Sequence, residues 1–164
     1  MNMCKLIRKV AVLVFMSFFC LICFSACGLY KDKNTVTTNI NNQDLKLLVA
    51  SSSKEREKGL SNRKEIPYDG MIFLFKTHLT AVFWMKDMCF PIDILWIANN
   101  KVVGILENVK PEPNVSDYFL KKYSSPKNID TVIELKAGRA EQLKITSGTA
   151  VNIKYNDGAK NGSQ

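Results

Sequence analysis

Several stretches of the chain have the hydrophobic patterns of β-strands. Met71–Phe75 is apolar throughout and too short for a typical helix, which favours a strand buried on both faces. Ala81–Lys86 alternates instead, which would place Trp84 and Lys86 on the face opposite Met85. The same kinds of pattern predict three further strands, at Asp44–Ala50, Thr131–Leu135 and Thr149–Tyr155.

Turn residues divide the middle of the chain into two more strands. Asn99 and Asn100 lie between the apolar stretches Ile94–Ala98 and Lys101–Leu106. Asparagine tolerates positive φ, so this arrangement predicts a tight β-hairpin. Pro91 interrupts the backbone hydrogen bonding just before the hairpin, because proline has no N–H to donate.

Two short helices are predicted beside these strands. Ser52 and Glu55 have the spacing of a capping box, which indicates a helical turn or two ending near Gly59. Ala137–Ile145 has the pattern of a second helix. With six or seven strands, the pattern predicts a mainly β fold, a small closed or half-closed β-barrel-like domain, because closure removes exposed strand edges.

The N-terminus has the pattern of a signal peptide. Lys5, Arg8 and Lys9 precede an uncharged apolar run from Val10 to Ala26. Small residues and then Cys27 follow this run, and together they resemble the lipobox of bacterial lipoproteins. That resemblance implies cleavage after residue 26 and a lipid on the Cys27 thiol. An uncleaved signal anchor and an ordinary secretory signal remain alternatives.

All three alternatives place the folded domain outside the cytoplasm. The lipoprotein hypothesis adds a membrane partner through the lipid anchor, on the outer face of a bacterial membrane. It gives a signal peptide at 1–26, a lipidated cysteine and flexible tether at 27–43, a folded domain at 44–155 and a flexible tail at 156–164. The tether is predicted because its residues are polar and lack any amphipathic period.

Charge and cysteine content limit the classes of partner. Removing residues 1–26 would take three of the 23 basic residues and none of the 15 acidic ones, so the net charge would fall from +8 to +5. This excess is too diffuse to indicate a nucleic acid partner, and export makes one less plausible still. Cys89 would be the one cysteine left without lipid, so the domain would rely on its core instead of a disulfide.

The strongest candidate site lies between residues 81 and 96, where apolar residues surround a few charges. Trp84 and Lys86 on one strand face could stack on and hydrogen-bond to a ligand, with Asp93 and Glu134 as further binding residues. The alternative is that Lys86 and Asp93 form a structural ion pair, or that Asp93 caps backbone amides near Pro91. The leading hypothesis is a domain that binds a small polar ligand or a cell-envelope polymer.

Two other functions remain open on the sequence. An enzyme acting on envelope glycan would use Asp87, Asp93 or Glu134 as acid and base, and two of these carboxyl groups would need to lie within about 10 Å. An interaction module would instead use the aromatic residues of Asp117–Tyr123, in the long irregular connection from Pro111 to Asn128.

The sequence does not predict a metal or cofactor. Soft ligands for Cu(I) fall close together, but without a recognised metal-binding spacing such as Cys-x-x-Cys. Methionine at alternating strand positions is also what core packing produces. The residues concerned are Met71, His78, Met85, Met88 and Cys89. Phosphate-loop, dinucleotide and serine-hydrolase motifs are absent from the sequence.

Four motifs resemble one known family in their order and spacing. They are Gly59-Leu60, Gly70-Met-Ile-Phe73, Trp84-Met-Lys-Asp-Met-Cys-Phe-Pro-Ile-Asp93 and Ile133-Glu-Leu-Lys-Ala-Gly138. The family is DUF192 (UPF0127), whose members are small, β-rich, barrel-like domains that are commonly exported or lipid-anchored and have no established biochemical function. Asp87 stands where the family usually has asparagine, and Ile92 where it usually has leucine. The resemblance implies the fold and the domain limits, but not a reaction.

Overall fold

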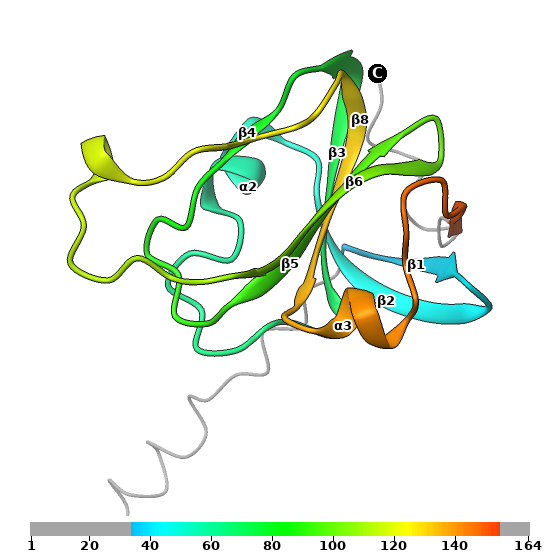
Figure 1. The fold of residues 1–164 in the computed structure, drawn as a ribbon, viewed down its shortest axis with the longest axis horizontal. Coiled ribbons are helices and arrows are strands. Elements are labelled where there is room, and N and C mark those ends of the chain that lie inside the picture. The colour runs from blue at the N-terminus through cyan, green and yellow to red at the C-terminus, as the bar shows by residue number, and fades with distance from the viewer. Residues whose placement is uncertain (1–33, 155–164) are drawn as a thin grey trace, which may run out of the picture. The chain divides into compact units, whose positions relative to one another are not determined.

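The computed structural model describes residues 34–154, which form a mainly β domain built on a curled sheet (Figure 1). The seven strands of this sheet lie side by side in the order β6 (Lys101–Val109), β5 (Ile92–Ala98), β8 (Ile129–Lys136), β3 (Gly70–Leu79), β2 (Gln43–Ala50), β1 (Thr35–Ile40) and β9 (Val151–Lys154). Neighbouring strands are antiparallel except β2 and β3, which are parallel.

Shorter elements complete the fold. A second sheet of two strands pairs β4 (Val82–Phe83) with β7 (Tyr123–Ser124). The helices are α2 (Ser53–Lys58), α3 (Arg139–Gln142) and the single 3₁₀ turn η1 (Asp117–Phe119).

The two edges of the large sheet meet at one end. Lys101, at the start of β6, forms an antiparallel bridge with Ala150, just before β9. The amide of Val102 donates to the carbonyl of Thr149 over 2.9 Å. The sheet is therefore a half-barrel closed at one end, as the sequence predicts, and closure satisfies backbone groups that an open edge would leave exposed.

Two hydrophobic cores lie on opposite faces of the central strands. The inner core, on the concave face, includes Leu47, Leu95 and Ile133. The outer core includes Phe73 and Trp96. Figure 1 shows α2 and β4 on one side of β3, β5 and β8, and β1 and β2 on the other. Every residue of β5 is consequently buried, which explains why its sequence is almost wholly apolar.

The local signals in the sequence agree with the structure where they are strongest. Asn99 and Asn100 have φ values of 52° and 58° and connect β5 to β6 as a tight hairpin. The capping box also forms, because the Ser52 hydroxyl accepts from the amide of Glu55 while the Glu55 carboxylate accepts from the amide of Ser52. The helix α2 then ends at Gly59.

Several boundaries differ from the prediction. The strand β1 lies within residues 27–43, where a flexible tether is predicted, so the folded domain begins at Thr35 instead of Asp44. Val36, Thr38 and Ile40 are buried at every second position of β1, an alternation hidden by the polar residues between them. The strand predicted over residues 81–86 ends at Phe83, and the second helix covers only Arg139–Gln142 of the predicted 137–145.

The predicted signal peptide, the lipidation site at Cys27 and the predicted tail lie outside the described residues. Within the described residues, no helix is long and apolar enough to cross a membrane. Both cores are built from residues 36–151, which belong to one compact unit, Lys33–Gln164. This unit therefore carries all the buried apolar surface described for the fold and can be studied by itself.

Candidate functional site

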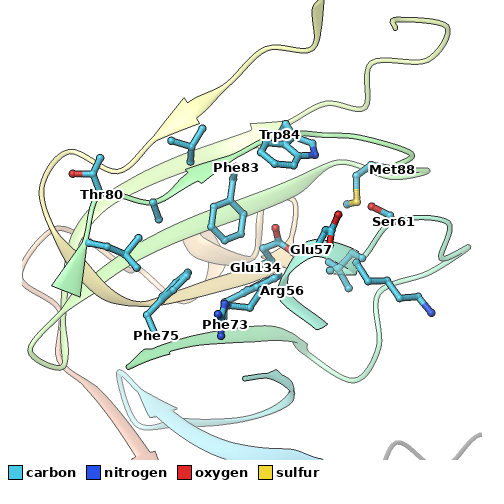
Figure 2. A pocket seen from close by; sticks show the side chains of 16 residues that line it. Arg56, Glu57, Ser61, Phe73, Phe75, Thr80, Phe83, Trp84, Met88 and Glu134 are labelled. Atoms are coloured by element: carbon cyan, nitrogen blue, oxygen red, sulfur yellow. The ribbon is translucent and has the colours of Figure 1, made fainter. Parts of the chain in front are cut away.

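A pocket of about 430 Å³ opens on the outer face of the sheet. Its size falls within the range of about 300–1,000 Å³ that is typical of small-molecule sites. Its walls come from four parts of the chain, as Figure 2 shows. They are α2 with the turn that follows it, the strand β3, the segment around β4, and one residue of β8.

Aromatic side chains make up much of the lining. Phe73 and Phe75 come from β3, and Phe83 and Trp84 from the β4 segment. The ring of Phe83 packs edge-on against Phe73, with 5.0 Å between centroids, and against Trp96 below it, at 5.5 Å. These contacts fix Phe83 over the sheet, whereas Trp84 at the rim is 44% exposed. The walls are thus a preformed apolar surface with one aromatic edge, Trp84, exposed to solvent.

The acidic residue Glu134, on β8, also lines this aromatic pocket. Its side chain is only 6% exposed, and its Oε2 atom has no hydrogen-bond partner within the described residues. In Figure 2 its carboxyl group lies in the middle of the lining, with Phe83 and Trp84 above it in this view and Phe73 and Arg56 below. Burial disfavours the charged form and raises the pKa of Glu134 from 4.5 to about 8.

The charged residues of α2 stand beside Glu134 without pairing with it. The guanidinium of Arg56 donates to the carbonyl oxygens of Ser51 and Leu74 and stacks over Phe75, 5.2 Å from the ring centroid. Glu57 and Lys58 also line the pocket. Arg56 is thereby held as part of the wall, and no cationic side chain within residues 34–154 pairs with the Glu134 carboxyl as the counter-ion that usually accompanies a buried acid.

Two glycines allow the pocket walls to approach each other. A Cβ atom on Gly70 would lie 2.2 Å from the carbonyl oxygen of Glu134, so β3 can pair closely with β8 only if this position lacks a side chain. Gly59 has φ of 47° and brings the turn after α2 near the ring of Phe73. The motifs that begin with these glycines therefore position two walls and the acidic group of the pocket.

Lys86 lies in a neighbouring, smaller cavity. This cavity has a volume of about 210 Å³ and is lined by Trp84, Lys86, Asp117, Leu120 and Lys122. The ammonium of Lys86 pairs with the carboxylate of Asp117, and this hydrogen bond and charge raise the pKa of Lys86. Trp84 separates the two cavities because it lines both. The predicted neighbourhood of Trp84 and Lys86 is present, but the partner of Lys86 is Asp117 and not Asp93.

Asp93 performs a different task, on the inner face of the sheet. Its carboxylate is completely buried and accepts hydrogen bonds from the amides of Asn108 (2.9 Å), Gly138 (3.2 Å) and Ala140 (2.9 Å). These bonds satisfy the free N–H groups at the start of α3 and at the end of the β5–β6 hairpin. The alternative that Asp93 caps backbone amides is therefore the one the geometry supports, although two of the three amides belong to a segment far along the chain.

Asp93 and Glu134 lie on opposite faces of the sheet. Asp93 is paired with Leu135, whose side chain belongs to the inner core, and Glu134 is the preceding residue of β8. Successive side chains of a strand point to opposite faces, so Glu134 faces the outer pocket. These two carboxyl groups cannot act together on one glycosidic bond, because the sheet separates them.

Asp87 is explained by its backbone conformation. Its φ is 53°, in the left-handed region that asparagine and aspartate adopt more readily than other residues with side chains. Its carbonyl accepts from the amide of Asn62 over 2.8 Å, which ties the loop to the turn after α2. Aspartate at this position can therefore adopt the same left-handed conformation that an asparagine would.

The possible soft-metal ligands are dispersed. Met71 and Met85 are buried in the outer core, whereas Cys89 is exposed. His78 is half exposed and lies 3.1 Å from the carboxylate of Asp130. Among residues 34–154, no group of three or more histidine, cysteine, aspartate or glutamate side chains is arranged to hold a metal ion.

The family assignment follows from the whole of this domain. The model of the DUF192 family, described as "Uncharacterized ACR", matches residues 35–153. The chain belongs to the DUF192 family. The match begins where β1 begins and ends within β9, so the DUF192 domain coincides with the half-barrel.

Two crystal structures share this fold. A protein of unknown function from Novosphingobium aromaticivorans is 29% identical, with a TM-score of 0.60, covering 72% of this chain and 83% of its own. A proposed transcription regulator from Sinorhizobium meliloti is 27% identical, with a TM-score of 0.62, covering 73% of this chain and 92% of its own. No curated protein matches the chain.

The sequence identified only part of the pocket. Trp84 and Glu134 were predicted as ligand-binding residues, and both line it. The sequence does not predict Phe75, Phe83 or Arg56 as binding residues, because no local pattern shows that α2 and the β4 segment fold onto the same sheet face. The glycine motifs were the available signal, since a glycine within an apolar motif often marks a close approach of backbone.

Proposed function

We propose that this DUF192 protein is a membrane-tethered, extracytoplasmic domain that binds a small ligand in the pocket over Glu134. The observation that carries the proposal is a buried carboxyl group in the lining of a pocket of aromatic side chains, one oxygen of which has no hydrogen-bond partner within the described residues. An unsatisfied buried polar group costs stability, and a ligand that bonds to it would recover that cost. The aromatic lining favours a ligand with an apolar or aromatic body over a wholly polar one.

The location outside the cytoplasm is supported by the N-terminal sequence. Three basic residues, an uncharged apolar run and Cys27 have the order of a lipoprotein signal. Replacing Cys27 by serine should abolish the incorporation of radiolabelled palmitate into the protein, whereas Cys23→Ser should leave it unchanged. Equal labelling of the two variants would count against lipidation at Cys27.

Ligand binding can be tested with the compact unit Lys33–Gln164. A set of small aromatic compounds would be screened for an increase in melting temperature, and each hit would be repeated on Trp84→Ala and Tyr118→Ala. Both substitutions remove an exposed aromatic side chain, but only Trp84 lines the pocket. The shift should persist in Tyr118→Ala and fall to less than half in Trp84→Ala. Equal shifts in both variants would show that the compounds bind elsewhere.

A second candidate function is docking of another protein, which the loop between β6 and β7 favours. Tyr118 and Phe119 are 87% and 75% exposed and pack edge-on against each other, with 5.1 Å between ring centroids. Figure 1 shows their segment, η1, projecting from the domain. Photo-cross-linking from position 119 in intact cells should trap a defined partner, and cross-linking from Tyr68, another exposed aromatic position, should not. The same product from both positions would contradict docking through the loop.

A further inference from the structure

We propose that the Glu134 side chain is itself a neutral carboxylic acid when it binds the ligand. The pocket then selects a ligand with an uncharged amide or other carbonyl group attached to an apolar or aromatic body. This inference rests on the proposed function and adds the chemical class of the ligand's polar group.

The carboxyl group of Glu134 lacks a hydrogen-bond partner at one of its oxygens within the described residues. A carboxylic acid offers an O–H donor and a carbonyl acceptor side by side. The Oε2 atom of Glu134 has no hydrogen-bond partner within the described residues, and aromatic walls from β3 and β4 border the same space. An amide presents the complementary N–H and C=O groups, so it can form two hydrogen bonds with the acid while its apolar body contacts the rings.

The charge balance disfavours an ionised ligand. A buried carboxylate without a partner is expensive, so Glu134 retains its proton, and burial raises its pKa to about 8. A ligand cation would have to ionise Glu134 and would approach Arg56 and Lys58 in the same lining, where Glu57 offsets only one of the two positive charges. A ligand anion would be attracted by the remaining positive charge, but Arg56 already donates to protein oxygens, and next to Glu134 the anion would lose its hydration among aromatic side chains.

The hydrogen bonds of Arg56 go to other oxygens and not to the carboxyl group of Glu134. Its guanidinium donates to Ser53 Oγ over 3.3 Å and to the carbonyl of Leu74 over 3.2 Å, in addition to its bond with the Ser51 carbonyl. These bonds hold it against the wall formed by Phe75. The pocket is therefore bordered by a cation that already has partners and by an acid whose Oε2 atom has none in the described part of the chain.

Four probes with the same phenyl ring can distinguish the ligand classes. Benzamide is uncharged with an amide, benzylamine is a cation, benzoate is an anion, and toluene has no polar group. Each would be titrated into Lys33–Gln164 at pH 6.5, with tryptophan fluorescence and the Trp84 and pocket backbone amide NMR shifts as readouts. Benzamide should bind with a dissociation constant at least about tenfold lower than the other three, as expected for one or two additional hydrogen bonds.

Glutamine at position 134 provides the matched control. Glu134→Gln keeps a donor and an acceptor at nearly the same positions but does not titrate. Benzamide binding to the wild type should weaken at least about tenfold between pH 6.5 and pH 9.5, as Glu134 loses its proton, while binding to Glu134→Gln should change less than twofold. Glu134→Leu should bind benzamide weakly at both pH values and toluene at least as well as the wild type does.

The outcomes separate this inference from the proposed function. If benzylamine binds more tightly than benzamide at pH 6.5, where the amine is a cation, the pocket binds ligands but Glu134 acts as an anion, and the inference is overturned. It is also overturned if the wild type and Glu134→Gln show the same pH dependence. If none of the probes perturbs Trp84 or the amide signals of the pocket, the proposed function fails as well.

Discussion

Two buried acids lie on adjacent strands of this domain and have opposite environments. Asp93 accepts three backbone hydrogen bonds, whereas Oε2 of Glu134 accepts none within the described residues. Burial raises the pKa of Glu134 because it disfavours the charged form of the carboxyl group. A carboxyl group therefore serves as a fixed structural cap on one face of the sheet and as an unsatisfied group on the other.

We expect a large loss of stability when Asp93 is substituted, because its carboxylate caps three backbone amides. Asp93→Asn should lower the free energy of unfolding by about 2–4 kcal/mol, because the amide is uncharged and its NH₂ group would face backbone donors. Chemical denaturation at pH 7 would measure the loss. Asp87→Asn is the control: it removes the same charge at an exposed left-handed position and should change stability by less than about 0.5 kcal/mol. Equal effects would contradict the assignment of Asp93 as the cap.

Glu134 predicts a pH dependence of stability. Its pKa is raised from 4.5 to about 8 in the folded state, so the folded protein binds more protons than the unfolded chain between these values. Stability due to this group is fully present below pH 4.5 and is lost by up to about 1.4 kcal/mol per pH unit until pH 8. Denaturation curves of Glu134→Gln should lack this fall, and its advantage over the wild type should increase from pH 5 to pH 8. Parallel pH profiles would show that Glu134 is ionised.

At the scale of elements, the pocket depends on how closely β3 can approach β8. Gly70 pairs with Leu135, and a Cβ atom on Gly70 would meet the backbone carbonyl of Glu134 instead of a side chain that could move aside. The strand that supplies the aromatic wall is thereby fixed against the strand that supplies the acid. A change at this contact should affect both strands and the pocket between them.

Gly70→Ala should therefore be strongly destabilising. The added methyl group would lie 2.2 Å from the Glu134 carbonyl oxygen and force the strands apart, at a cost of about 2–4 kcal/mol. Thermal denaturation would measure this cost. Gly148→Ala is a useful comparison, because a Cβ atom there meets nothing within 4 Å and only the positive φ of 92° is unfavourable. A smaller loss for Gly70→Ala than for Gly148→Ala would contradict the close-approach explanation.

At the scale of the whole molecule, two cores share one curled sheet. The strand β1 joins β2 to β9, and Val36 and Ile40 belong to the inner core. The ends of the sheet meet only through the segment around Ala150, which β1 supports by pairing with β9. The first strand of the domain therefore stabilises the closure of the half-barrel as well as its own edge.

This arrangement predicts the N-terminal limit of the folded unit. A chain beginning at Lys33 should unfold cooperatively, whereas a chain beginning at Asp44 loses β1 and should expose the inner core and the edge of β2. Circular dichroism melting and size-exclusion chromatography would distinguish a folded monomer from an unfolded or aggregated product. A cooperative transition of equal midpoint in both chains would show that β1 is dispensable.

The sequence by itself determined the elements that rest on neighbouring residues. The Asn99–Asn100 hairpin, the capping box at Ser52 and the apolar strand at Met71–Phe75 all appear as predicted, because turn conformation, helix capping and strand burial each leave a local pattern. These patterns were also enough for the mainly β, half-closed barrel-like fold.

Only the tertiary structure decided which side chains share a site. Lys86 was predicted near Asp93 but pairs with Asp117, and Asp93 caps amides 45 and 47 residues along the chain. Glu134 was predicted beside Lys86 and lies instead in the aromatic pocket that α2, β3 and β4 enclose. Strand order and sheet curl bring these groups together, and a local sequence pattern does not show contacts between segments so far apart. The pocket and its unpartnered acid are therefore properties of the folded molecule.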